Sequence, residues 1–142
     1  MTNHWLFWAL LSAVFAALTA ILTKLGLHGV DSDIAQLVRT VVVVLAIGAA
    51  ILALGKWRAF ADLNTANWIY LVLAGLATGA SWACYFRALK VGEVARVAAV
   101  DKLSVVFVAI FAAVLLSERL SPVGWLGVAL AGTGAVLLSI GK

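Results

Sequence analysis

Five long apolar segments follow one another along the chain, separated by short polar breaks. They cover residues 5–27, 34–54, 68–89, 94–116 and 122–140. A bilayer core about 30 Å thick is crossed by about 20 apolar residues in a helix. Strands with open edges would leave backbone polar groups unpaired in lipid, so such segments cross as helices. The pattern predicts an all-α integral membrane protein in which five transmembrane helices form a single domain over residues 1–142.

The polar breaks carry the residues that end and begin helices. Gly29 is followed by Asp31, which reads as a glycine stop and an acidic helix start. Ser121 directly precedes Pro122, the order of an N-cap residue and a proline in the first helical turn. The break over residues 55–67 is the longest, and we expect it to be a loop.

The composition supports a membrane protein and argues against several other classes of protein. Hydrophobic residues make up 65% of the chain and charged residues 11%, against about 25% charged in soluble domains. One cysteine, Cys84, and two histidines supply no disulfide framework and no metal-ligand cluster, so we expect no cofactor and no metal. No nucleophile or acid–base pair stands at catalytic spacing, so an enzyme, even one acting on lipid, is the weakest interpretation. We read the first segment as a retained helix, not a signal peptide.

The basic residues predict an orientation. The net charge of +4 fits placement at helix ends near anionic lipid, and we expect no nucleic-acid partner. The face that holds the first and third breaks and the C-terminus carries Lys24, Arg39, Arg87, Lys90, Arg96, Lys102 and Lys142, whereas the other face carries Lys56, Arg58 and Arg119. This bias predicts a cytoplasmic C-terminus and an N-terminus outside. If Arg39 and Lys102 lie within helices and are excluded, the count of basic residues on the two faces is five against three. A difference this small also permits insertion in both orientations.

The fourth segment carries Asp101 and Lys102 about two turns inside its start. Ionisable residues at this depth are costly and face a packed interior or a wet cavity, which makes them candidates for function. Lys24, Arg39 and Arg87 approach the membrane from the same side, so the five residues could form a basic vestibule with one acid. Because adjacent helical residues point about 100° apart, we expect Asp101 to pair with Arg39 or Arg87. For Lys24, Arg87 and Lys102, snorkelling to lipid headgroups is an equally good interpretation.

Aromatic residues show a second asymmetry. Most of them fall near the face opposite the basic one, as an interfacial belt would: Trp5, Trp8, Trp57, Trp68, Tyr70 and Trp125. Trp82 stands apart, and it forms a polar and aromatic patch with Ser81 and Tyr85 at helical spacing. The patch is either core packing with an interface anchor or the wall of a cavity.

The order of several motifs resembles a known family. They are LLSAVFAALTAILTKLGL, QLVRT, YFRALKVGE, AAVDKLSVVFVAIFA and LLSERLSPVGWLGVALAGTGAVLL. Over nearly its full length the chain resembles the five-helix EamA-like members of the drug/metabolite transporter superfamily, which correspond to one half of the ten-helix transporters. One departure is the DKLS sequence, where many ten-helix relatives have a proline in the fourth segment.

The resemblance implies a multi-pass protein of a bacterial or archaeal inner membrane that exports or exchanges small metabolites through a central cavity. The residues that it places in the lining, as candidates for substrate binding, are Thr19, Thr23, Arg39, Ser81, Trp82, Tyr85, Asp101 and Ser104. Asp101, Lys102, Arg87 and Lys24 are also candidates for ion coupling or ion pairing.

Ten-helix relatives join two halves of opposite topology around a midplane site. A five-helix chain can reproduce that arrangement with a second copy or an inverted paralogue, so we expect a homodimer, in antiparallel arrangement, or a paralogue heterodimer. The favoured function is secondary transport of a small polar or amphipathic metabolite by alternating access. The alternative is a non-transporting accessory subunit or half-partner of a larger transporter, which the small-residue faces of the first and fifth helices would also serve.

Overall fold

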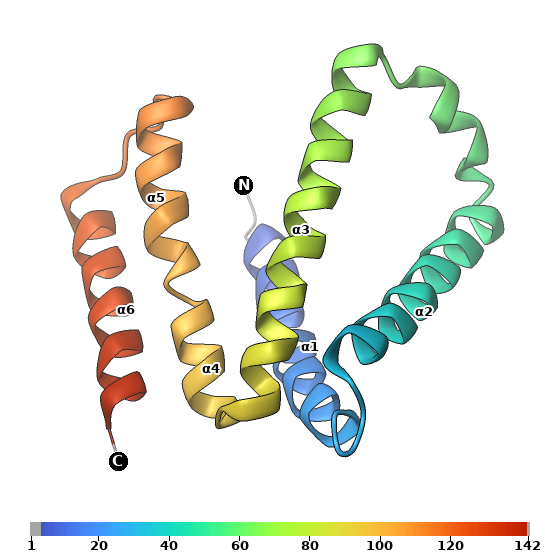
Figure 1. Cartoon of the computed structure of the whole chain (residues 1–142). Helices are drawn as coiled ribbons and strands as arrows, with labels where there is room; N and C mark the ends of the chain where they lie inside the picture. Colours follow the sequence, from blue (N-terminus) through green and yellow to red (C-terminus); the bar gives the residue numbers. More distant parts are fainter. Residues whose placement is uncertain (1–3, 142) are drawn as a thin grey trace. The chain divides into compact units, whose positions relative to one another are not determined.

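The computed structural model describes residues 4–141, which leaves Lys142, one of the basic residues counted above, outside the described chain. All regular structure in the described part is helical (Figure 1). The elements are α1 (His4–Gly26), α2 (Ser32–Ala53), the 3₁₀ helix η1 (Lys56–Asp62), α3 (Thr65–Val91), α4 (Val94–Asp101), α5 (Ser104–Leu115) and α6 (Pro122–Ile140).

These elements provide five stretches long and apolar enough to cross a membrane, with α4 and α5 together forming the fourth, Val94–Leu115. The expected all-α architecture with five spans is confirmed. Few apolar side chains of the described chain are buried, and most large ones are exposed, as expected where lipid is the solvent. Exposed residues include the aromatic ones expected at the membrane interface: Trp5, Trp8, Trp57, Trp68, Tyr70 and Trp125.

Two expected helix starts are present. The Asp31 carboxylate accepts hydrogen bonds from the backbone N–H of Asp33 at 2.9 Å and of Ile34 at 3.4 Å, which caps α2. The preceding turn passes through Gly29, whose φ of +71° lies in the region that glycine adopts without strain. The Ser121 hydroxyl oxygen accepts from the N–H of Gly124 at 3.1 Å and caps α6, with Pro122 in the first turn.

The fourth span is broken, although we expected one helix over residues 94–116. α4 ends at Asp101 and α5 begins at Ser104. Through the break, backbone N–H groups bond three residues back: Leu103 to the Val100 carbonyl at 2.9 Å and Val105 to the Lys102 carbonyl at 3.0 Å. Tightening of this kind marks a 3₁₀ turn between two α-helical pieces. The prediction of a continuous helix was wrong because hydropathy records only the apolar run, whereas hydrogen-bond register decides where the helix is interrupted.

The long connection after α2 also differs from the expected loop. It begins at Gly55, with φ of +65°, and then forms η1. Within η1 the rings of Trp57 and Phe60 pack with their centroids 5.1 Å apart. The connection therefore has helical structure and an aromatic contact of its own.

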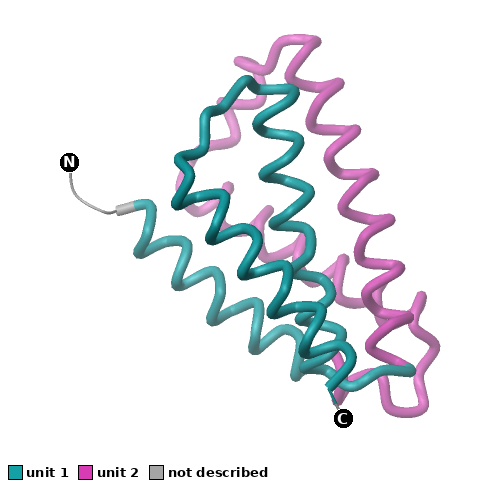
Figure 2. Tube along the Cα trace, turned by 90° about the vertical axis from the view of Figure 1, so that its left-hand side faces the viewer, with its two compact units in different colours: residues 1–22, 91–142 teal, residues 23–90 magenta. Residues whose placement is uncertain are grey.

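The chain separates into two compact units, coloured in Figure 2. Residues 23–90 form one unit, in which α2 and α3 approach each other at the start of α2 and diverge toward η1 (Figure 1). The other unit holds residues 1–22 and 91–142, and in it α6 packs against both α4 and α5. Buried alanines, among them Ala109 and Ala135, allow helices of this second unit to approach closely.

Candidate functional site

The polar residues Asp33, Gln36 and Arg39 recur at every third position of α2 and all contact α3. Such spacing keeps side chains near one face of a helix. The side-chain amide of Gln36 donates to the Gly79 carbonyl at 3.1 Å. This bond holds α2 close to α3 at Gly79, which has no side chain. Arg39, one turn further along α2, then lies beside Trp82 of α3.

Arg39 lies against two aromatic rings of α3. Its guanidinium carbon is 4.2 Å from the centroid of the Trp82 ring and 5.5 Å from that of Phe86. Arg39 and Trp82 are half-buried, and Phe86 is 2% exposed. A cation over an aromatic face is attracted by the ring quadrupole, more strongly where water is excluded. The rings therefore hold the positive charge of Arg39 inside a membrane-spanning segment.

Tyr85 completes this cluster. It is half-buried, follows Trp82 by three residues on α3, and lies near enough to Arg39 to interact with it electrostatically. Ser81 is exposed on the same helix. We call Arg39, Trp82, Tyr85 and Phe86 the arginine–aromatic cluster. It can bind a charged or amphipathic solute through its cation and its apolar rings.

The ion pairs differ from those expected for Asp101. Arg87 pairs with Asp33 at 3.0 Å, and Asp101 pairs with the adjacent Lys102 at 3.5 Å. Adjacent helical residues can still pair when one side chain is long and flexible, and here the Lys102 amino group lies near the Asp101 carboxylate at the end of α4. Both pairs are exposed: the side chains of Arg87 and Asp33 are 63% and 58% accessible. Exposed pairs contribute little to stability.

The remaining expected site residues fall into both units. Thr23, Arg39, Ser81, Trp82 and Tyr85 belong to residues 23–90, whereas Thr19, Asp101 and Ser104 belong to the other unit. The Thr19 hydroxyl donates to the Phe15 carbonyl at 2.8 Å within its own helix. The structure brings Arg39, Trp82 and Tyr85 together, and a functional role for these and for the other residues stays a prediction.

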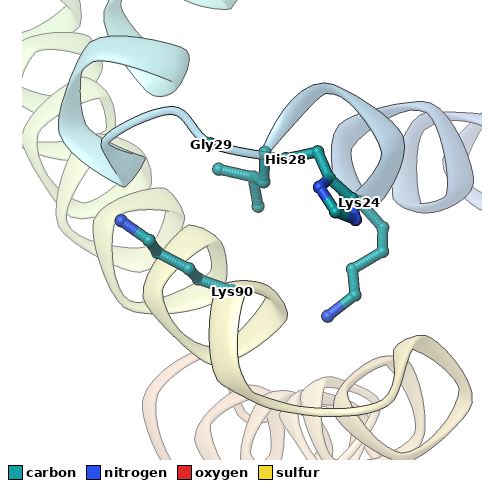
Figure 3. A pocket seen from close by; sticks show the side chains of 5 residues that line it. Lys24, His28, Gly29 and Lys90 are labelled. Atoms are coloured by element: carbon teal, nitrogen blue, oxygen red, sulfur yellow. The ribbon is translucent and has the colours of Figure 1, made fainter.

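A cavity of about 280 Å³ lies at the turn between α1 and α2, lined by Lys24, Leu27, His28, Gly29 and Lys90. The amino group of Lys24 donates to the Leu89 carbonyl at 2.6 Å, which satisfies a carbonyl near the C-terminal end of α3. Figure 3 shows the amino groups of Lys24 and Lys90 pointing in different directions. Lys24 thus has a structural bond here, and the two lysines do not converge on one point.

Asp31, beside this cavity's turn, has a pKa below its ordinary value of 3.8. The main causes are the hydrogen bonds that its carboxylate accepts from the backbone of Asp33 and Ile34, and the positive charges of Lys90 and Arg87 add to them. The carboxylate is therefore ionised at neutral pH and serves as a cap.

Sequence reasoning missed Gln36 and Phe86. A signal for Gln36 was present, because it stands midway between Asp33 and Arg39 on an otherwise apolar helix. Phe86 gave none, since a phenylalanine in an apolar segment has no distinguishing pattern. Within residues 4–141 no group of three or more histidine, cysteine, aspartate or glutamate residues is placed to hold a metal ion.

Comparison with known proteins agrees with the fold and with the resemblance. The EamA-like transporter family model matches residues 3–140. A protein of Sinorhizobium sp described as an uncharacterized transporter in the cobO 3' region is 52% identical over 140 residues, which cover 99% of each chain. No solved structure matches the chain. The chain therefore belongs to the EamA-like transporter family, a family of multi-pass membrane transporters and not of enzymes.

Proposed function

We propose that this transporter exports or exchanges a small polar or amphipathic metabolite as a secondary transporter working by alternating access. The observation that carries the proposal is the arginine–aromatic cluster: a guanidinium 4.2 Å from the Trp82 ring, within membrane-spanning helices. Charged residues at membrane depth mark substrate or ion pathways. A cation beside apolar rings offers one contact for each part of an amphipathic solute.

The proposal includes a dimer. Alternating access in related architectures uses two repeats of opposite topology around a midplane site, and this chain provides five candidate spans. A second copy or an inverted paralogue would supply the other five. We propose an antiparallel homodimer as the working unit, with the bacterial or archaeal inner membrane as its location.

Transport can be tested with the purified protein in vesicles. Proteoliposomes would be loaded with an isotope-labelled pool of small acids, amines and neutral solutes, and release would be followed by mass spectrometry. We expect at least one solute to leave faster than from protein-free vesicles. Release at the protein-free rate for every solute, from protein shown to be folded and inserted, would contradict transport of this solute range.

Asp101 is proposed as the ion-coupling group, because its carboxylate lies within the fourth span and next to the helix break. An imposed pH gradient should drive accumulation of a transported solute by the wild type. Asp101→Asn should abolish this accumulation while exchange without a gradient continues. Glu118→Gln, which changes an acid outside the span, provides the matched control. Unchanged gradient-driven accumulation in Asp101→Asn would remove Asp101 from the coupling step.

A further inference from the structure

The charge of Arg39 is compensated differently from that of three other bases in the spans, Arg87, Arg96 and Lys102. Arg87 pairs with Asp33 at 3.0 Å, and Lys102 pairs with Asp101 at 3.5 Å. Arg96 likewise pairs with Glu93, at 2.9 Å. None of the ion pairs in residues 4–141 includes Arg39, which lies against the rings of Trp82 and Phe86 and interacts electrostatically with Tyr85.

The carboxylates of its own unit are engaged or remote along the chain. Within residues 23–90 they are Asp31, Asp33 and Asp62. Asp31 caps the start of α2, Asp33 pairs with Arg87, and Asp62 ends η1, beyond the other end of α2. No hydrogen bond in the described chain uses the Arg39 guanidinium as a donor.

Aromatic rings satisfy only part of what a guanidinium requires. The group stays protonated in proteins and carries five N–H donors, arranged as a fork that matches the oxygens of a carboxylate or phosphate. The rings of Trp82 and Phe86 attract the charge, but they offer no oxygen acceptor to the N–H groups. A half-buried guanidinium with unused donors in an apolar setting is therefore suited to an incoming oxyanion.

We propose that Arg39 binds the carboxylate or phosphate group of the transported solute, with the half-buried Trp82 ring contacting the apolar part of that solute and the buried Phe86 ring stabilising the guanidinium. The inference rests on the proposed transport function and names its substrate class, organic anions. The same chemistry is present in the phosphate of an anionic lipid headgroup, so the test must separate a solute from a lipid.

The vesicle assay with mixed solutes provides the first arm. We expect the solutes released by the wild type to carry a carboxylate or phosphate group, and Arg39→Gln to slow their release by about 10-fold or more at limiting concentration. Arg39→Lys, which keeps the charge without the fork, should lie between the two. Arg58→Gln is the matched control, because it removes an arginine from η1, outside the spans.

The outcomes separate the two proposals. Release of nothing above protein-free vesicles would overturn transport and this inference together. If the wild type releases only amines or neutral solutes, the transport proposal stands and the anion assignment is overturned. This outcome needs no variant. Anion release at the wild-type rate by a folded Arg39→Gln would overturn the role of Arg39. If Arg39→Gln unfolds at a temperature far below that of the wild type, inhibition of solute release by the wild type is measured instead. Benzoate should inhibit this release more strongly than its neutral analogue benzamide. Equal inhibition by the two compounds would overturn the anion assignment.

The second arm concerns lipid. Thermal unfolding of the wild type and of Arg39→Gln would be compared in phosphatidylcholine vesicles with and without phosphatidylglycerol. We expect phosphatidylglycerol to affect both proteins equally. Stabilisation by phosphatidylglycerol that Arg39→Gln lacks, together with unchanged anion release by that variant, would assign the oxyanion to a headgroup and overturn the solute assignment.

Discussion

At the scale of single residues, the contact of Arg39 with Trp82 joins a charge to an apolar surface. Its carbon-to-centroid distance of 4.2 Å is well inside the range of cation–π attraction. Serine, threonine or asparagine at position 82 would supply a hydrogen bond but no ring face. Trp82 thus stabilises the position of the guanidinium and also forms apolar surface beside it.

Trp82→Leu should weaken the site while the helix remains. A cation–π contact contributes about 0.5–2 kcal/mol, so we expect KM for the transported solute to rise about 2- to 30-fold. Trp82→Phe keeps a ring and should have a smaller effect. Trp68→Leu is the control, because Trp68 is 49% exposed in the same helix and has no contact with Arg39 in the described structure. Equal changes in KM for the leucine variants at positions 82 and 68 would contradict the assignment.

The sequence identified candidate site residues better than it identified their interaction partners. Arg39, Trp82 and Tyr85 were all identified from charge and aromatic character within apolar segments, and the structure groups them. The partner of Arg87 was not predicted, because the contact of Asp33 with a residue 54 positions away depends on how α2 approaches α3. The Asp101–Lys102 pair was missed because its geometry depends on the helix ending there.

At the scale of elements, helix ends were predictable and the interior interruption was not. Ser121 and Asp31 are recognisable because capping is a local property of a few residues. The division between α4 and α5 falls at Asp101 and Lys102, which interrupt an otherwise apolar segment, and no glycine or proline marks it. Local chemistry therefore located the starts of α2 and α6 but not the tightened turn within the fourth span.

The Asp31 cap predicts a dependence of stability on pH. Because the folded-state pKa of Asp31 lies below 3.8, ionisation of this carboxylate favours the folded state at pH values above 3.8. The contribution is lost as pH falls below 3.8 and through the lower folded-state pKa. Asp31→Asn can still accept hydrogen bonds but should lack this acid-dependent loss, whereas Asp31→Ala should be less stable at neutral pH.

Thermal unfolding of the three proteins in one detergent over a pH series would measure the effect of Asp31. The difference between wild type and Asp31→Asn should shrink toward the acid end. Asp62→Asn provides a control for the loss of an acid outside the cap. Identical pH profiles for wild type and Asp31→Asn would show that the Asp31 charge does not contribute.

Gly132 of α6 lies where this helix packs closely against Val106 of α5. A Cβ added at Gly132 would lie 3.0 Å from the Cγ2 atom of Val106, whereas at Gly127, on the same helix, it would meet nothing within 4 Å. Valine has little rotamer freedom in a helix. Gly132→Ala should therefore be less stable than Gly127→Ala by about 1–3 kcal/mol, the usual cost of overpacking.

The Gly132 contact can be checked by denaturation in mild detergent. Adding Val106→Ala to Gly132→Ala should recover part of the loss, because it removes the clashing methyl group. Equal stability of the two single glycine variants would show that α5 and α6 separate without cost at this position.

At the scale of the whole molecule, five candidate spans predict that the two ends of this chain lie on opposite sides of the membrane. Reporter fusions at both ends would measure the orientation. We expect each terminus to give both cytoplasmic and external signals, since the basic bias is weak and an antiparallel dimer needs both orientations. Adding lysines to the break over residues 55–67 should shift the population toward one orientation and reduce transport. A single fixed orientation in the wild type would require a parallel dimer or an inverted paralogue.

The interruption of the fourth span contains no proline, because the one proline of the chain is Pro122. Each residue from Asp101 to Val106 keeps its backbone N–H, so the same stretch can rejoin into an unbroken α-helical ladder through small rotations, which a proline ring would forbid. The interruption of the helix is therefore reversible. Under the proposed alternating access, half of the fourth span can tilt at this turn as the protein opens to one side of the bilayer and then to the other.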